Sequence, residues 1–140
     1  MTDPVPVVDD VYDLVAGTCT VFQRMNSRGD MLRVATNVEK QDGTRAIGTY
    51  IPAVNPDGQP NPVVSTVMQG QTYYGRAYVV NSWYITAYEP LFDADRKVCG
   101  ILYVGVLEKA YTSIYNKIIL TFAGIAVLGF ILTAIITYTM

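Results

Sequence analysis

Arginine and tyrosine side chains that could hold a small anion are concentrated in the second half of the chain. Arg76 and Tyr78 share one parity of a strand-like segment. Tyr84, Thr86 and Tyr88 share one parity of the next such segment. Because alternate residues of a strand point to one face, each segment can present a polar and aromatic wall, on which a guanidinium holds a carboxylate bidentately and tyrosine hydroxyls complete the shell. The spacing predicts a site for a small molecule, with a carboxylate as the candidate ligand.

Three further candidates lie at strand or loop ends, where a lid can close over a pocket: Tyr50, Asn81 and Trp83. Core packing is the better account of these three residues. A structural ion pair, for example with Glu89, is at least as good an account of Arg76 as a ligand contact. The sequence therefore supplies candidates and leaves both interpretations open.

Several kinds of chemistry are disfavoured by composition. The chain has no histidine, and its two cysteines, Cys19 and Cys99, are far apart, so we expect no metal site, no cofactor and no conventional catalytic nucleophile. We therefore expect that the protein is not an enzyme. The charge is nearly balanced, with 10 Lys+Arg against 12 Asp+Glu, so we expect no nucleic-acid partner.

Both cysteines lie in strand-like runs. The default expectation for such a residue is a small buried hydrophobe. A disulfide between them becomes geometrically possible if their strands prove to be neighbours.

The elements that must position the candidate residues follow a simple order. Apolar spacing predicts a short amphipathic helix over 7–16, and Asn61, Pro62 and Gly70 provide the start and stop signals of a second short helix. Segments rich in β-branched and aromatic residues predict five strands, namely 18–25, 31–38, 73–80, 83–91 and 97–107. This order predicts an α+β domain, in which a five-stranded antiparallel sheet has flanking helices packed on one face.

The last segment, Ile118–Met140, contains no charged residue. As a helix it extends about 34 Å, enough to cross a hydrocarbon core of about 30 Å, so we expect a transmembrane helix. The predicted organisation is a sensor domain over 1–109, a juxtamembrane helix over 110–117 and the membrane span over 118–140. No flexible linker separates the last strand from the span, so movement of that strand could pass into the membrane.

Several segments resemble the Cache 3/Cache 2 fusion type of sensor domain, found in bacterial methyl-accepting chemotaxis proteins and sensor histidine kinases. The segments that carry the resemblance are 20–25, 44–52, 70–81, 83–91 and 100–106. The resemblance covers roughly 4–109 and implies a PAS-like fold that binds a small molecule outside the cell. It also implies signal transduction across the inner membrane by a homodimer, with the sensor domain in the periplasm.

The chain departs from that family pattern in three ways. Family members begin with a first transmembrane helix and a long N-terminal helix, and we find neither in this sequence. They also continue past the second span into a HAMP linker and an output module, which we do not find either. Separately, residues 1–6 lack the features of a signal peptide. We therefore expect the chain to be the membrane-proximal part of a receptor, as a fragment or a truncated gene. Cys99 stands where the family pattern leads us to expect an aliphatic residue.

A second function remains open at this point. A non-catalytic interaction domain, anchored by its C-terminal helix and facing the cytosol, would have the same hydrophobic tail. The charges do not decide the orientation, because Lys109 and Lys117 flank only the N-terminal end of the span.

Overall fold

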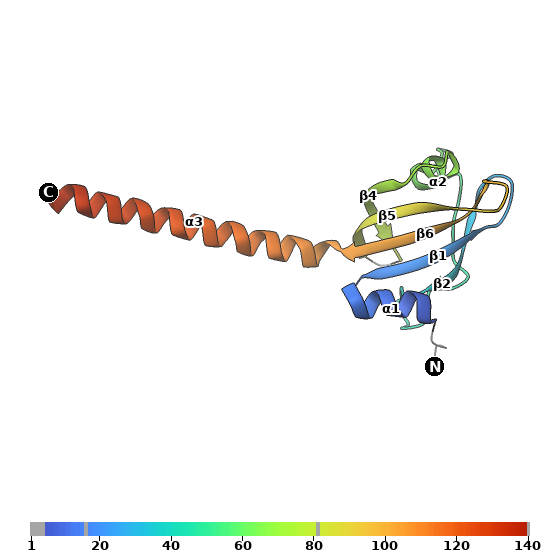
Figure 1. Ribbon diagram of the computed structural model, residues 1–140, viewed down its shortest axis with the longest axis horizontal. Coiled ribbons are helices and arrows are strands. Elements are labelled where there is room, and N and C mark those ends of the chain that lie inside the picture. Colours follow the sequence, from blue (N-terminus) through green and yellow to red (C-terminus); the bar gives the residue numbers. More distant parts are fainter. Residues whose placement is uncertain (1–4, 16, 81, 140) are drawn as a thin grey trace. The chain divides into compact units, whose positions relative to one another are not determined.

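The computed structural model describes residues 5–15, 17–80 and 82–139, and their side chains except at 15 and 110–114. Two compact units make up the chain, Met1–Leu107 and Glu108–Met140. The first unit has an α+β fold, as expected from the sequence (Figure 1). Its elements are α1 (Pro6–Val15), β1 (Thr18–Arg24), β2 (Met31–Thr36), β3 (Tyr50–Ile51), α2 (Pro62–Met68), β4 (Tyr73–Val79), β5 (Ser82–Phe92) and β6 (Val98–Leu107).

The strands form one antiparallel sheet in the order β3-β2-β1-β6-β5-β4. The expected count of five strands was therefore one too low. The additional strand, β3, consists only of Tyr50 and Ile51, which pair with Leu32 and Met31 of β2. A two-residue strand carries no alternation, so it gives no signal in the sequence.

The local start and stop signals act as predicted. The Asn26 side chain in the β1–β2 turn accepts a hydrogen bond from the Gly29 N–H (3.1 Å) and donates one to Asp30 (2.7 Å). At the start of α2, the Asn61 side chain accepts a hydrogen bond from the Val63 N–H (3.0 Å). After α2, Gly70 has a φ of 77°, a left-handed conformation that glycine adopts without strain.

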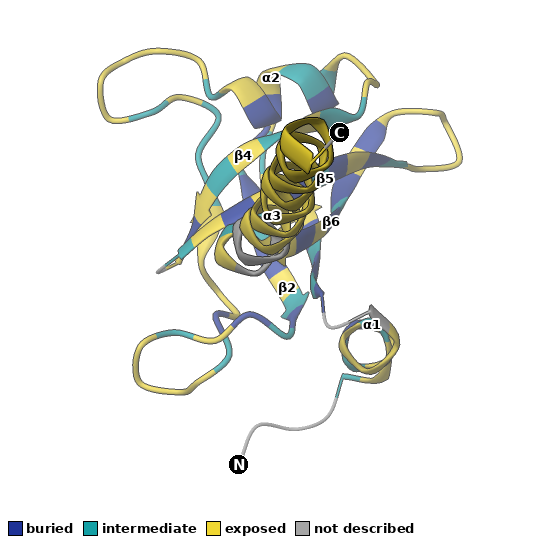
Figure 2. Ribbon diagram, turned by 90° about the vertical axis from the view of Figure 1, so that its left-hand side faces the viewer, coloured by how far each residue is buried: buried dark blue, intermediate teal, exposed yellow. Residues whose placement is uncertain are grey.

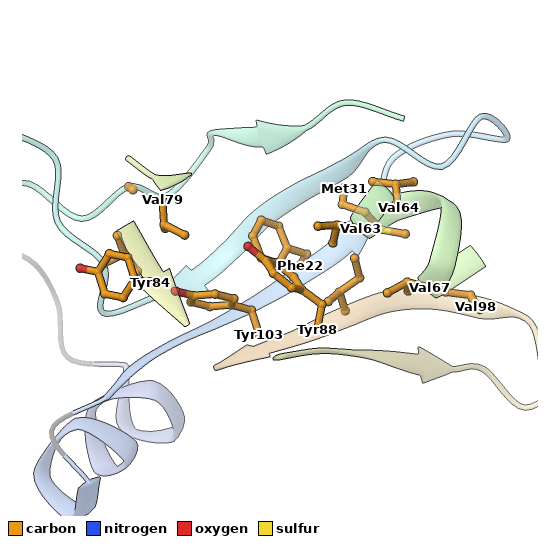
Figure 3. Packing of buried hydrophobic residues seen from close by; sticks show 13 residues of the cluster. Phe22, Met31, Val63, Val64, Val67, Val79, Tyr84, Tyr88, Val98 and Tyr103 are labelled. Carbon is orange, nitrogen blue, oxygen red and sulfur yellow. The ribbon is translucent and has the colours of Figure 1, made fainter. Parts of the chain in front are cut away.

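The core lies on one side of the sheet, which we call the inner face. This face is made of alternate strand residues and is covered by α2, whose buried Val63, Val64 and Val67 reach into the core (Figures 2 and 3). The largest strand residues in it are Phe22, Met31, Tyr84, Tyr88, Ile101 and Tyr103. The opposite side, the outer face, carries the intervening residues and is exposed over β4, β5 and much of β6.

The expectation that the helices pack on one face holds only for α2. Val8, which is the buried residue among the described side chains of α1, lies outside the inner core, and Val11 borders a groove with Ile85 and Val106 of the outer face. Asn37 ties α1 to β1, because its side chain donates to the Val8 carbonyl (2.8 Å) and accepts from the Cys19 N–H (2.7 Å).

Cys19 and Cys99 do not form a disulfide bond. β1 and β6 are neighbours, but Cys19 pairs with Val104, and Cys19 and Cys99 are both free. Cys19 is buried, as expected of a small hydrophobe. Cys99 is exposed, contrary to that expectation, because it belongs to the outer face near the start of β6, where its thiol donates to the Leu91 carbonyl.

The second unit is α3, a single helix over Glu108–Thr139 that begins directly after β6. Its stretch Tyr115–Thr139 is long and apolar enough to cross a membrane, with a mean hydropathy of 2.6. The side chains of this stretch are not buried by the rest of the protein, as the exposed colouring of α3 in Figure 2 shows. A helix that is apolar on all sides and unburied is typical of a membrane span rather than of a core helix. Met140, the last residue of the expected span, lies outside the described residues.

Candidate ligand-binding site

A row of three tyrosines crosses the inner face on adjacent strands. Tyr73, Tyr88 and Tyr103 are direct cross-strand partners on β4, β5 and β6. Their rings are in contact: the centroids are 6.0 Å apart for Tyr73 and Tyr88, and 4.9 Å apart for Tyr88 and Tyr103. The row forms an aromatic floor.

Glycines make room for two of these rings. A Cβ atom at Gly75 would lie 2.7 Å from the Tyr73 hydroxyl, and one at Gly105 would clash with the Tyr103 hydroxyl. The rings of Tyr73 and Tyr103 therefore lie along their own strands, each over the glycine two residues later, and do not stand upright from the sheet.

A cavity of about 580 Å³ opens beside this floor, within the range of pockets that take small ligands. It lies between β4, the start of α2 and the segment that contains β3. The residues that line it are Arg33, Lys40, Thr49, Tyr50, Ile51, Pro52, Asn61, Pro62, Val63, Tyr73, Arg76, Ala77, Tyr78, Val79, Val80 and Tyr88. This set contains three cations and no carboxylate.

Arg33 is the deepest charge in the cavity. The residue is only 7 % exposed, and it lies opposite Phe22 in the β1–β2 register, with its guanidinium carbon 5.1 Å from the centre of the Phe22 ring. One terminal nitrogen, Nη1, donates to the Thr49 hydroxyl (2.7 Å), which in turn donates to the Ala46 carbonyl (2.8 Å). The loop before β3 therefore holds the guanidinium at a fixed position.

The Arg33 guanidinium is incompletely satisfied. Its Nε is buried and has no hydrogen-bond partner among the described residues, and no carboxylate of those residues forms an ion pair with it. Burial lowers the pKa of Arg33, and nearby Tyr88 and Tyr103 oppose that shift, but an arginine stays protonated in proteins. A buried cation without a counter-charge costs free energy, which an anion bound beside it would offset.

Tyr88 and Tyr103 of the floor stay neutral over the physiological pH range. Burial raises the pKa of Tyr88 to about 12, against a smaller opposing influence from Arg33. Burial also raises the pKa of Tyr103, whose hydroxyl is hydrogen-bonded to that of Thr18 (3.0 Å). These hydroxyl groups remain able to donate hydrogen bonds.

The structure brings four of the seven predicted site residues to the cavity: Tyr50, Arg76, Tyr78 and Tyr88. Tyr84 instead borders a second pocket, which also includes Asp9, Asp13 and Arg45. Trp83 belongs to neither lining. Asn81 lies outside the described residues.

The predicted alternation is present within β4 and within β5, but the candidate residues of β4 lie on the opposite face of the sheet from those of β5. Tyr84 and Tyr88 lie on the inner face, and their partners on β4 are Ala77 and Tyr73. Arg76 and Tyr78 belong to the outer face and reach the cavity only at its rim, because β4 is the edge strand. The Arg76 guanidinium lies 4.0 Å from the centre of the Trp83 ring and is not placed among the Tyr84 and Tyr88 hydroxyls.

The sequence reasoning missed Arg33, Thr49 and Asn61 as cavity residues. Arg33 shares parity with the core residue Met31, which is a weak signal. Thr49 is identified as a cavity residue only through its hydrogen bond with Arg33, because nothing in the local sequence links it to that residue, sixteen positions earlier.

Comparison with known proteins gives one match. The model of a family described as the Cache 3/Cache 2 fusion domain matches residues 1–123, most of the chain. No curated protein and no solved structure matches the chain significantly.

Proposed function

Because the chain belongs to the family of Cache 3/Cache 2 fusion domains, we propose that it is the extracellular sensor of a bacterial transmembrane receptor and that it binds a small carboxylate. The family supports an extracellular sensor domain, and α3 supports a membrane anchor. Domains of this family are generally non-catalytic, and we propose no enzymatic activity. The receptor class we propose is a chemoreceptor or a sensor histidine kinase of the inner membrane, with the domain in the periplasm.

The observation that carries the ligand class is the buried Arg33. Its Nε faces no protein acceptor among the described residues, and the cavity lining adds Lys40 and Arg76 without an acid. A carboxylate supplies both a negative charge and two acceptor oxygens in the plane that a guanidinium prefers. The aromatic floor then accommodates the less polar part of the ligand.

The proposed signal follows the sheet from Arg33 to α3. Arg33 contacts Phe22 on β1, and Phe22 pairs with Ile101 on β6. β6 ends at Leu107 and α3 begins at the next residue, so no flexible spacer absorbs a shift of the strand. In a homodimer, such a shift would move one α3 against its partner helix.

A thermal-shift screen of the full chain in detergent micelles tests the ligand class. Each small carboxylic acid is paired with its own primary amide, which has a similar shape but no charge. We expect at least one acid to stabilise the protein, by about 2.7 kcal/mol at 100 times its dissociation constant, and its amide to have no effect. Equal stabilisation by acid and amide would contradict the carboxylate assignment.

A protease-protection experiment on intact cells tests the topology. We expect an externally added protease to cleave the segment 1–107 once the outer membrane is permeabilised, while a cytoplasmic control protein stays intact. Protection of this segment until the inner membrane is lysed would contradict a periplasmic sensor and favour a cytosolic domain.

A further inference from the structure

The outer face of the sheet carries a second cluster of aromatic and cationic side chains, two of which, Arg76 and Tyr78, also form the rim of the cavity that contains Arg33. We call it the outer aromatic patch and define it by Arg76, Tyr78, Trp83, Ile85 and Val106, all of which are exposed. Trp83 is 44 % exposed although it is one of the largest apolar side chains in the chain. An exposed cluster of this kind marks a surface that meets something other than water.

The patch is an ordered surface. Arg76 stacks on Trp83 at 4.0 Å, and Tyr78, the cross-strand partner of Trp83, packs edge-on against it with ring centroids 5.4 Å apart. In the next row, Arg76, Ile85 and Val106 are direct partners across β4, β5 and β6. The two rows make a continuous strip across three strands.

The patch lies at the end of the sheet where the chain continues into α3. Tyr84 pairs with Leu107, the last residue of β6, and Trp83 is the residue next to Tyr84. The helix rises about 12 Å from Leu107 to Tyr115, where the apolar stretch begins. Chain connectivity therefore keeps Trp83 within about 20 Å of the start of that stretch, for any orientation of the sheet.

We propose that the outer aromatic patch docks on the headgroup layer of the membrane that α3 crosses. Tryptophan and tyrosine prefer this layer because their rings are apolar and their N–H and O–H groups need polar partners. The layer adds about 5 to 8 Å on each side of the hydrocarbon core, so it lies within reach of the patch across the roughly 12 Å of helix between Leu107 and Tyr115 and the length of the Trp83 side chain. The Arg76 guanidinium fits lipid phosphate, which accepts hydrogen bonds from two of its nitrogens.

This inference rests on one part of the proposed function, the crossing of a bilayer by α3, and not on the ligand. It gives Arg76 and Trp83 a role at the lipid surface. Docking would restrict how the sensor sheet is oriented above the bilayer, and thus how a shift of β6 reaches α3.

The single tryptophan of the chain makes a direct test practicable. The full chain is reconstituted into vesicles of phosphatidylcholine and phosphatidylglycerol that contain lipids with a nitroxide either at the headgroup or deep in the acyl chain. Trp83 should lose most of its fluorescence with the headgroup label and much less with the deep label.

A matched control moves the probe to the other end of the same strand. The variant W83F/F92W places its only tryptophan at a position of similar exposure, since Phe92 is 52 % exposed. The two positions lie roughly 30 Å apart along β5, so the emission of Trp at 92 should be unaffected by the headgroup label. Equal quenching at both positions would overturn the proposal, because the contact would then not be specific to the patch.

Flotation of the vesicles separates failure of this proposal from failure of the anchor. If the protein floats and Trp83 is unquenched by both labels, docking is wrong while the membrane anchor stands. If Trp83 is unquenched by lipid and also protected from iodide in water, a second copy of the chain covers the patch and docking is again wrong. If the protein does not float, the anchor fails and docking fails with it.

Discussion

The two faces of the sheet carry the same pair of chemical groups in opposite surroundings. On the inner face, Arg33 stacks on Phe22 and is 7 % exposed. On the outer face, Arg76 stacks on Trp83 at the open surface. The surroundings of such a contact, more than its residue types, set the electrostatic cost of the arginine. Burial makes the charge of Arg33 costly without an anion, whereas the charge of Arg76 is exposed to solvent.

The largest expected contrast between the faces concerns stability. Ile101 is fully buried beneath the inner core, and Val104, on the same strand, is 40 % exposed on the outer face. We expect Ile101→Ala to lower the free energy of unfolding by about 3 kcal/mol and Val104→Ala by less than about 1 kcal/mol. Chemical denaturation of the full chain, followed by near-UV circular dichroism, measures both. Similar losses at the two positions would mean that the outer face is covered by other protein.

The second contrast concerns the ligand. Hydrogen bonds to a charged group contribute about 1.5 to 3 kcal/mol, so Arg33→Gln should weaken binding of a stabilising acid by about 10- to 100-fold. Arg76→Gln should weaken it by less than about threefold, because its charge is exposed. Isothermal titration calorimetry on both variants gives the two affinities. The reverse ranking would make Arg76 the anchor, as the residue pattern alone suggested.

The third prediction uses the alkaline pH dependence of the inner face. The pKa of Tyr88 is raised in the folded protein to about 12, so its contribution to stability is complete below about pH 10. As the pH rises from about 10 to 12, the Tyr88 hydroxyl ionises in the unfolded chain but not in the folded one. The free energy of unfolding then falls by up to about 1.4 kcal/mol per pH unit. Tyr88→Phe should reduce that slope in denaturation curves recorded across this range. An unchanged slope would show that Tyr88 is not buried in solution.

The smallest expected effect is that of Arg33 on the ligand-free protein. Replacing a buried, uncompensated cation by an apolar side chain of similar length is often neutral or stabilising, so Arg33→Met should leave the free energy of unfolding unchanged or raise it by up to about 1 kcal/mol. Arg76→Met, the exposed counterpart, should lower it by no more than about 1 kcal/mol, because an exposed cation–π contact such as the one with Trp83 contributes little. Denaturation in ligand-free buffer measures both. A loss above about 2 kcal/mol for Arg33→Met would mean that Arg33 holds the fold together and is not reserved for a ligand.

Much of the fold could be predicted from sequence because its signals are local. The Asn61–Pro62 start of α2, the turn at Asn26 and the β-rich runs from Tyr73 onward each specify their own segment. The apolar stretch in α3 could also be predicted from the sequence, because its length and composition suffice to identify it.

The site could be predicted only in part because it depends on pairing between segments. The sequence shows which residues alternate within β4 and within β5. It does not show which residues of β4 share a face with which residues of β5, because that depends on the hairpin register, in which Tyr78 pairs with Trp83 and Tyr73 with Tyr88. Arg33 was hidden for a related reason. Leu32 and Val34 are as apolar as Met31, so alternation in β2 does not show which parity faces the core.

The packing of tyrosine rings over glycines has a consequence for how the cavity can change during evolution or design. Tyr73 occupies the space above Gly75, so a larger residue at Gly75 displaces the end of the Tyr73 ring, or requires a smaller side chain at position 73. Substitutions at the two positions are therefore coupled. The depth of the cavity at this edge is set by a pair of residues, and a change at the glycine alters the position of the tyrosine as well.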